Sequence, residues 1–236
     1  MAKKHLSRLA APNTWPIERK KTKWIAKPSP GPHNLNFSMP LNVWLCEVLK
    51  LAKTKAEIKK ILNQKEILVN NKTVKDLRYP LGLFDVLSIP KIKTAYRIII
   101  SKNNKLKAIN CPPSEIDYTL AKVIKKTTVK KGRCQITLSN GWTFLANPKE
   151  YLIGDSVLIN LKKKEFKSLP LEIGALAYIV QGSNTAKIGK IVAFSEEGLL
   201  RKKKYVHIQT DSETFKVLKD HIYIIGKDKP IITLET

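Results

Sequence analysis

Acidic side chains are scarce in this 236-residue sequence, in which 19 Asp and Glu stand against 44 Lys and Arg and leave a formal net charge of +25. A positive field of this strength attracts polyanions and releases their counterions on contact. Nucleic acid is therefore the first partner that the composition predicts, and an anionic membrane surface is a weaker second.

Long apolar runs and closely spaced cysteines are missing as well. No run approaches the ~18 residues of a membrane-spanning helix, and the N-terminus, MAKKHLSRLAAPNTWPIERKK, lacks the apolar centre of a secretory signal. The three cysteines, Cys46, Cys111 and Cys134, lie too far apart for a CxxC pair, and their odd number does not suit a disulfide framework. We expect free thiols, a cytoplasmic location and no membrane partner.

The sequence also lacks the arrangements that catalysis needs. It contains neither a GxxxxGK[ST] loop nor a GxSxG elbow, and no two of its four histidines have the i, i+4 spacing of a helical metal site. Asp85, in GLFDVLSI, is more typical of a turn cap than of a catalytic base. We therefore expect no enzyme, no catalytic residue, no metal, no cofactor and no small-molecule substrate.

Basic residues, by contrast, are spread over most of the chain. Residues 1–38 have a net charge of +7, residues 39–93 of +6 and residues 94–170 of +10, whereas residues 171–236 have only +2. An enzyme with one basic tail would concentrate its charge at one end. This distribution predicts that an extended anionic surface engages most of the chain.

Residues 1–38 predict an extended basic arm. Prolines fix φ and remove backbone donors, so KPSPGPH (27–33) is expected to lack an internal hydrogen-bond ladder and to lie on another surface. Trp15 and Trp24 offer rigid rings that either stack on bases or pack on a neighbouring domain. A disordered tail is the open alternative, since the composition is also typical of disorder.

Residues 39–93 predict two short helices followed by a hairpin. Ser38 is the expected N-cap of a helix over about 41–52, in which apolar residues repeat at helical spacing. Thr54-Lys55-Ala56-Glu57 has the pattern of a capping box that starts the second helix. The stretch ILVNNKTV (67–74) then predicts two strands around an asparagine-rich turn.

From residue 94 onward, short β-type runs alternate with Gly, Asn and Pro, which is typical of small barrels or sandwiches. In LSNGWTF, Asn140-Gly141 favours a type I′ hairpin turn, because both residues tolerate a positive φ. The lysine clusters at 125–126, 130–131 and 162–164 are either solvated strand edges or phosphate contacts. The fold class predicted for the whole chain is α+β with several modules.

Four stretches together resemble the archaeal and eukaryotic small-subunit ribosomal protein family S4e almost from end to end. They are HLSRLAAPNTWPIERKKTKW, KPSPGPHNLNFSMPL, LKLAKTKAEIKKILNQKEILVNNKTVKDLRYPLGLFDVLSIPK and IIGKDKPIITL. The resemblance implies an N-terminal arm (1–38), an S4-type RNA-binding module (39–93), a central β domain (94–170) and a C-terminal KOW-type SH3-like barrel (171–236). It also implies docking on small-subunit ribosomal RNA beside neighbouring ribosomal proteins, with PSPGPH lying along the RNA.

Two positions depart from the pattern of that family. S4-type modules usually place an arginine in the first helix where this chain has Cys46, so we expect Lys50 or Lys53 to substitute in that RNA contact. The KOW element keeps Gly182 and Gly189 but has Ala186 where the family tends to have glycine.

We expect RNA contacts from the arm, from the helix pair with its hairpin, and from the basic loop after Gly198. The expected residues are Lys3, Lys4, His5, Arg8, Arg19, Lys20, Lys21, Lys23, Trp24, Lys27, His33, Lys50, Lys53, Lys55, Lys59, Lys60, Lys75, Arg78, Arg201, Lys202, Lys203 and Lys204. They would serve a structural protein of the ribosome that acts in translation.

Two other functions stay open on the sequence alone. An RNA-modifying enzyme similar to a pseudouridine synthase, with an S4-type accessory module, would need a catalytic domain, for which residues 94–236 are too short and too divided. A transcription factor that uses a KOW barrel on polymerase and nascent RNA is the other, and the basic N-terminal arm argues against it.

Overall fold

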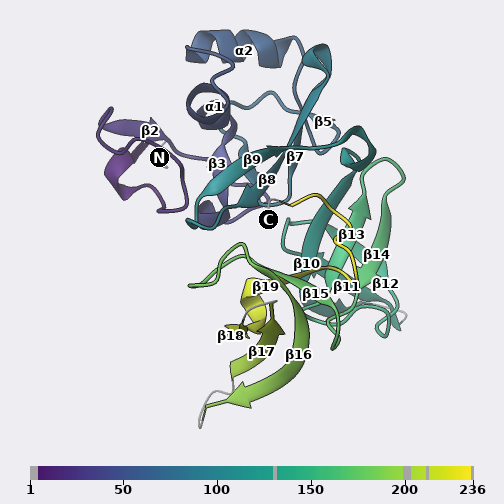
Figure 1. Ribbon diagram of the computed structural model, residues 1–236. Coiled ribbons are helices and arrows are strands. Elements are labelled where there is room, and N and C mark those ends of the chain that lie inside the picture. Colours follow the sequence, from purple (N-terminus) through teal and green to yellow (C-terminus); the bar gives the residue numbers. More distant parts are fainter. Residues whose placement is uncertain (1–4, 130–131, 199–202, 211–212, 235–236) are drawn as a thin grey trace. The chain divides into compact units, whose positions relative to one another are not determined.

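Strands are the main regular element of the computed structural model, which describes residues 5–129, 132–198, 203–210 and 213–234 (Figure 1). The chain divides into two units, Met1–Ile99 with Lys105–Thr119 and Ile100–Asn104 with Leu120–Thr236. Helices are few, so the helical share of the expected α+β fold is small. Short 3-10 turns lie at Arg8–Ala10, Leu35–Phe37, Pro90–Ile92, Pro113–Glu115 and Lys219–His221.

The first unit contains a five-stranded sheet in the order β5-β4-β7-β8-β9. These strands are Lys72–Thr73, Leu68–Val69, Val86–Ile89, Thr94–Ile100 and Leu106–Asn110. Asn70 and Asn71 connect β4 to β5 and both have positive φ, 50° and 60°, which makes the expected hairpin a type I′ turn. Strands β8 and β9 extend this same sheet, although their residues fall within the range expected for the central β domain.

The first helix of the unit begins at Leu41, as the periodicity predicts, but ends sooner than expected. It consists of α1 (Leu41–Val43) and a π-helical segment, Trp44–Val48, and Lys50 follows with a φ of 53°. Ser38 is not its N-cap, because Ser38–Pro40 forms β3 and pairs with β6 (Pro80–Gly82). That expectation was wrong, since long-range pairing keeps the backbone extended up to Pro40.

The second helix, α2 (Lys55–Asn63), starts where its sequence predicts. The backbone N–H of Glu57 donates to Thr54 Oγ1 at 3.2 Å, and the backbone N–H of Thr54 donates to the Glu57 carboxylate at 3.4 Å. The capping box is therefore confirmed, and it fixes which side of α2 is buried. Ile58 and Leu62 face the unit, so the lysines of α2 face solvent.

The N-terminal segment is folded on the first unit from residue 5 onward. Strand β1 (His5–Ser7) pairs with β2 (Trp24–Ala26), and the buried Trp15 donates its Nε1–H to the Leu35 carbonyl at 3.3 Å. Trp15 thus packs on protein, as one of the two alternatives predicted, and disorder is excluded for the described part of the arm.

The proline-rich stretch 27–33 lies on β6 and the turn before it. The Ser29 N–H donates to the Arg78 carbonyl at 2.8 Å, and the Ser29 hydroxyl donates to Asp76 at 2.8 Å. A Cβ on Gly31 would come within 2.5 Å of the Pro80 ring, so only glycine allows this approach. The surface on which this stretch was expected to lie is therefore, at these contacts, another part of the same unit.

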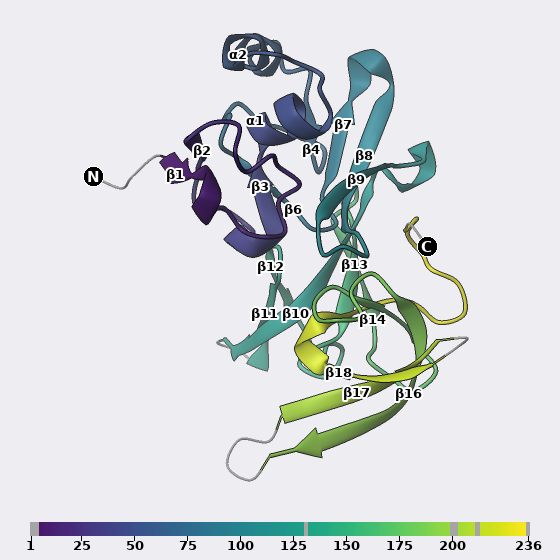
Figure 2. The ribbon, with the colours of Figure 1, turned by 60° about the vertical axis from the view of Figure 1, so that its left-hand side comes forward.

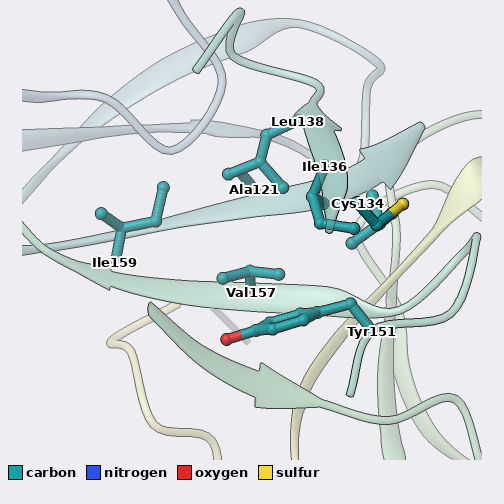
Figure 3. Packing of buried hydrophobic residues seen from close by; sticks show 8 residues of the cluster. Ala121, Cys134, Ile136, Leu138, Tyr151, Val157 and Ile159 are labelled. Atoms are coloured by element: carbon teal, nitrogen blue, oxygen red, sulfur yellow. The ribbon is translucent and has the colours of Figure 1, made fainter. Parts of the chain in front are cut away.

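The second unit contains a central sheet in the order β12-β11-β10-β13-β14. These strands are Thr143–Ala146, Cys134–Leu138, Tyr118–Thr128, Ser156–Asn160 and Glu165–Leu169. Ala121, Ile136, Leu138 and Val157 belong to one buried cluster inside the sheet (Figure 3). Phe144 of β12 and Phe166 of β14 stack with centroids 4.0 Å apart, so the sheet curls until its two edge strands meet.

The Asn140-Gly141 hairpin forms with a different turn from the one expected. Leu138 N–H donates to the Trp142 carbonyl and Gly141 N–H donates to the Leu138 carbonyl, which gives a three-residue loop of residues 139–141. Gly141 has a φ of 77°, but Asn140 has no positive φ. The type I′ expectation was wrong, because the loop has three residues and not two, and only Gly141 takes up a positive φ.

A second five-stranded sheet of this unit has the order β18-β17-β16-β15-β19. Its strands are Thr214–Leu218, Lys203–Gln209, Ile188–Glu197, Leu176–Ile179 and Ile222–Gly226, where the sequence predicts strands. Strands β16 and β17 form a long hairpin (Figure 2). Ala186, which precedes β16, has a φ of 66°, the backbone conformation that glycine adopts most readily.

Candidate nucleic-acid interface

The outer face of α2 presents three exposed lysines, Lys55, Lys59 and Lys60. In the part of the chain that the structure describes, none of them forms an ion pair with a carboxylate. Their side chains are therefore available to an external anion. Figure 1 shows α2 beside α1 at the margin of the first unit.

More cations surround the helix pair. Lys50, Lys53 and Lys75 are exposed, and Arg78 is half-buried. Cys46, which stands where an arginine was expected from the resemblance, is half-buried, and its pKa is raised by burial and by the nearby Glu47 and Glu57 carboxylates. Lys50 and Lys53 supply exposed positive charge in the loop that follows this helix.

Arg8 faces inward. Its guanidinium donates to both carboxylate oxygens of Glu47, at 2.9 and 2.7 Å, and also to Thr22 Oγ1 and the Glu18 carbonyl. The hydrogen bond to Glu47 raises the pKa of Arg8 despite the opposing effect of burial. Arg8, one of the residues expected to contact RNA, thus ties the arm to the helix pair.

Arg19 also forms its hydrogen bonds within the arm. Its guanidinium donates to the carbonyls of Leu9, Ala11 and Pro12 and to Asn13 Oδ1, at 2.6–3.2 Å. These bonds fold the segment between β1 and β2 around the side chain. Arg19 is therefore only partly available to an external ligand.

His33 and Asp85 form the buried polar centre of the first unit. Asp85 accepts from His33 Nε2 and Asn70 Nδ2, both at 2.7 Å, and from the Gly82 N–H at 2.9 Å. Burial lowers the pKa of His33, but the charge of Asp85 and the hydrogen bond outweigh it, so the pKa is raised. Asp85 thus closes the turn before β7, and its expected structural role is confirmed.

Four lysines of the described arm face outward. Lys20, Lys21, Lys23 and Lys27 are exposed. Trp24 is 50% exposed, and the Lys23 ammonium lies 5.4 Å from its ring centroid. The arm therefore divides into cations used within the protein and cations presented to solvent.

The basic loop after Gly198 lies mostly outside the described residues, as do Lys3, Lys4, Arg201, Lys202 and the side chain of His5. Lys203 and Lys204 are exposed at the start of β17. The Lys204 ammonium lies 3.2 Å from the Glu196 carboxylate, so part of the charge of this hairpin is compensated locally.

Sequence reasoning missed two buried cations. Arg97 donates to the Glu115 carboxylate at 2.5 Å and to the Tyr118 carbonyl at 3.0 Å. In the second unit Lys122 donates to the carbonyls of Lys219 and Ile222, and burial lowers its pKa to about 8. The acceptors of Lys122 are about a hundred residues away in sequence, so no local pattern indicates either contact.

Two features are absent from the described residues. They contain no cluster of three His, Cys, Asp or Glu side chains placed to hold a metal ion. In the same residues no helix is long and apolar enough to cross a membrane.

Family models match three consecutive parts of the chain. The RS4NT domain matches residues 2–36, the S4 domain residues 39–87 and the ribosomal S4e family residues 92–166. The S4 domain match includes α2 and its exposed lysines.

Several curated proteins are similar over nearly the whole length. The small ribosomal subunit protein eS4 of Methanocella arvoryzae is 36% identical over 98% of both chains, and that of Nanoarchaeum equitans is 40% identical over 80% of this chain and 81% of its own. The crystal structure of 30S ribosomal protein S4e from Thermoplasma acidophilum matches with a TM-score of 0.70 and 26% identity, over 81% of this chain and 96% of that one.

Proposed function

This chain belongs to the eS4 family of small ribosomal subunit proteins, and on that premise we propose that it is a structural component of the small subunit that binds and stabilises folded ribosomal RNA in translation. The observation that carries the proposal is the face of α2, where Lys55, Lys59 and Lys60 point to solvent within the part matched by the S4 domain. Lysines so placed neutralise phosphates and release counterions.

The proposed contact surface follows exposure and not charge alone. It retains the outward cations of the arm and of the helix pair, Lys203 and Lys204 of the β16–β17 hairpin, and Trp24. It leaves out Arg8 and His33, whose polar groups are bonded to Glu47 and Asp85, and Arg19, which is bonded to carbonyls of the arm. Its partners are small-subunit ribosomal RNA and neighbouring ribosomal proteins in the cytoplasm.

We also propose four functional segments, the arm (1–38), the S4-type module (39–93), the central β domain (94–170) and a KOW-type SH3-like barrel (171–236). The three family matches support the first three segments. The five-stranded sheet that ends in β19 supports the last, because small barrels of this kind are built from one curled antiparallel sheet.

The family is structural and not enzymatic, so the RNA-modifying alternative is not retained. The transcription-factor alternative has no support in the relatives, which are named as ribosomal proteins.

Sedimentation of a cell extract tests the proposal. The tagged protein is expected in the fractions of free small subunits and of complete ribosomes at physiological ionic strength. Raising the salt concentration should release it, because phosphate contacts weaken with salt. Recovery of the protein only at the top of the gradient, at physiological ionic strength, would contradict the proposal.

A further inference from the structure

A shallow aromatic pocket of about 370 Å³ lies along the seam where β12 and β14 approach each other in the central sheet. Its lining includes Arg133, Phe144, Asn147, Glu150, Tyr151 and Phe166. Neither the three family matches nor the sequence pattern assigns a role to this pocket. Its position on the seam means that two edge strands contribute side chains to one depression.

Three rings form the apolar part of the pocket. Phe144 and Phe166 stack almost parallel, with an interplanar angle of 8°, and Tyr151 meets Phe144 edge-on with centroids 5.1 Å apart. The Tyr151 hydroxyl donates to the Phe166 carbonyl at 2.9 Å. Phe144 and Phe166 are only half-buried, so this rigid group has ring surface left to contact a ligand.

The rim of the pocket carries positive charge. Arg133 and Lys149 are exposed, and Lys126 donates to the carbonyls of Pro148 and Tyr151 beside the pocket. The one acidic residue of the lining, Glu150, accepts from Asn147 Nδ2 at 2.6 Å. The pocket therefore combines an aromatic floor, cations at its edge and one amide–carboxylate pair.

We propose that this pocket binds an unpaired base of RNA, which stacks on the Phe144–Phe166 pair while the exposed Arg133 faces an adjoining phosphate. Bases outside a duplex stack readily on aromatic side chains, and each such contact contributes roughly 1–3 kcal/mol. An apolar side chain of a partner protein would fill the floor but would not need the cationic rim. The inference rests on the proposed function and adds a second, specific contact far from α2 in sequence.

Photo-crosslinking tests the location of this contact. The full chain is bound to small-subunit ribosomal RNA of its own organism, transcribed with 4-thiouridine, irradiated and digested with trypsin. Crosslinks are expected on the peptides CQITLSNGWTFLANPK (134–149) and EYLIGDSVLINLK (150–162). Crosslinks on peptides of the arm and of α2 alone would overturn the inference and leave the proposed function intact.

Phe144→Leu tests the stacking, because leucine keeps the apolar volume but removes the ring. The expected result is a loss of RNA affinity of about tenfold, from the stacking contribution of one base. Phe194→Leu is the matched control, since Phe194 is 46% exposed on β16, away from the pocket lining, and its variant is expected to bind within about twofold of the wild type, as sequence-independent contacts remain. Circular dichroism and thermal unfolding verify that both variants fold.

If Phe144→Leu destabilises the sheet, Arg133→Glu provides a second variant, because this exposed side chain has no core contact to lose. Wild-type affinity in both variants would overturn the inference. Normal RNA binding combined with poor incorporation of Phe144→Leu into reconstituted subunits would also overturn it, in favour of a protein side chain as the occupant. Failure of the wild type to bind the RNA would instead contradict the proposed function.

Discussion

The arm and α2 contain the same kind of residue in opposite surroundings. Arg8 and Arg19 donate to oxygens of the protein itself, whereas Lys55 and Lys59 point to solvent. Charge alone made both groups candidates for RNA contact. The difference teaches that the partners already present, and not the sign of the charge, decide whether a basic residue stabilises the fold or remains available to a polyanion.

The largest effect is expected from removing Asp85, the buried carboxylate to which His33 of the arm is bonded. Asp85→Ala leaves His33 and Asn70 without their acceptor inside the unit. We therefore expect the free energy of unfolding to fall by about 3–5 kcal/mol. Urea denaturation followed by tryptophan fluorescence measures the loss. Asp228→Ala removes an exposed carboxylate as a control, and a loss as small as in that variant would refute the structural role of Asp85.

Reversing the charges of the exposed lysines of α2 should weaken RNA binding and leave stability almost unchanged. Substitution of Lys55, Lys59 and Lys60 by Glu is expected to make the negative slope of log affinity against log salt shallower by about 3, roughly one for each lysine. The free energy of unfolding should change little. Filter binding to small-subunit ribosomal RNA over a salt series measures the slope. The control reverses Lys190, Lys227 and Lys229, which changes net charge equally in the least basic segment; equal effects of both triples would show that only total charge matters.

Arg8→Lys separates charge from geometry in the arm. Lysine keeps the positive charge but cannot donate to both Glu47 oxygens and to Thr22 together, so we expect a loss of about 1–2 kcal/mol in unfolding free energy. RNA affinity should not change at temperatures where the variant is folded. A variant of unchanged stability and reduced RNA affinity would place Arg8 among the outward cations instead.

The smallest expected effect is a pH dependence from His33. Its pKa is raised in the folded state, so the ion pair with Asp85 contributes fully below the unfolded pKa of about 6.5 and is lost as the pH rises through the folded pKa. The free energy of unfolding should therefore fall with rising pH in that window, by at most about 1.4 kcal/mol per pH unit for one proton. His33→Gln should lack this slope, and an identical slope in the variant would contradict the assignment.

Features set by neighbouring residues could be predicted from the sequence. The capping box of Thr54 and Glu57, the Asn70-Asn71 turn and the alternating strands of the second unit depend on residues within a few positions of each other. Their energies are local, so their patterns are visible without a structure.

Features set by distant residues could not be predicted. Arg8 meets Glu47 thirty-nine positions away, and His33 meets Asp85 fifty-two positions away. The extended backbone of Ser38–Pro40 likewise depends on pairing with β6, which no local pattern at Ser38 reveals. The sequence therefore indicated that the protein is basic, but the structure was needed to divide its cations into inward and outward groups.

Lysine acylation before and after assembly tests most directly whether the outward cations of α2 face ribosomal RNA. Mass spectrometry should find Lys55, Lys59 and Lys60 reactive in the free protein, protected in purified small subunits, and reactive again after ribonuclease digestion of those subunits. Equal reactivity of these three lysines in the free protein and in the intact subunit would contradict the account.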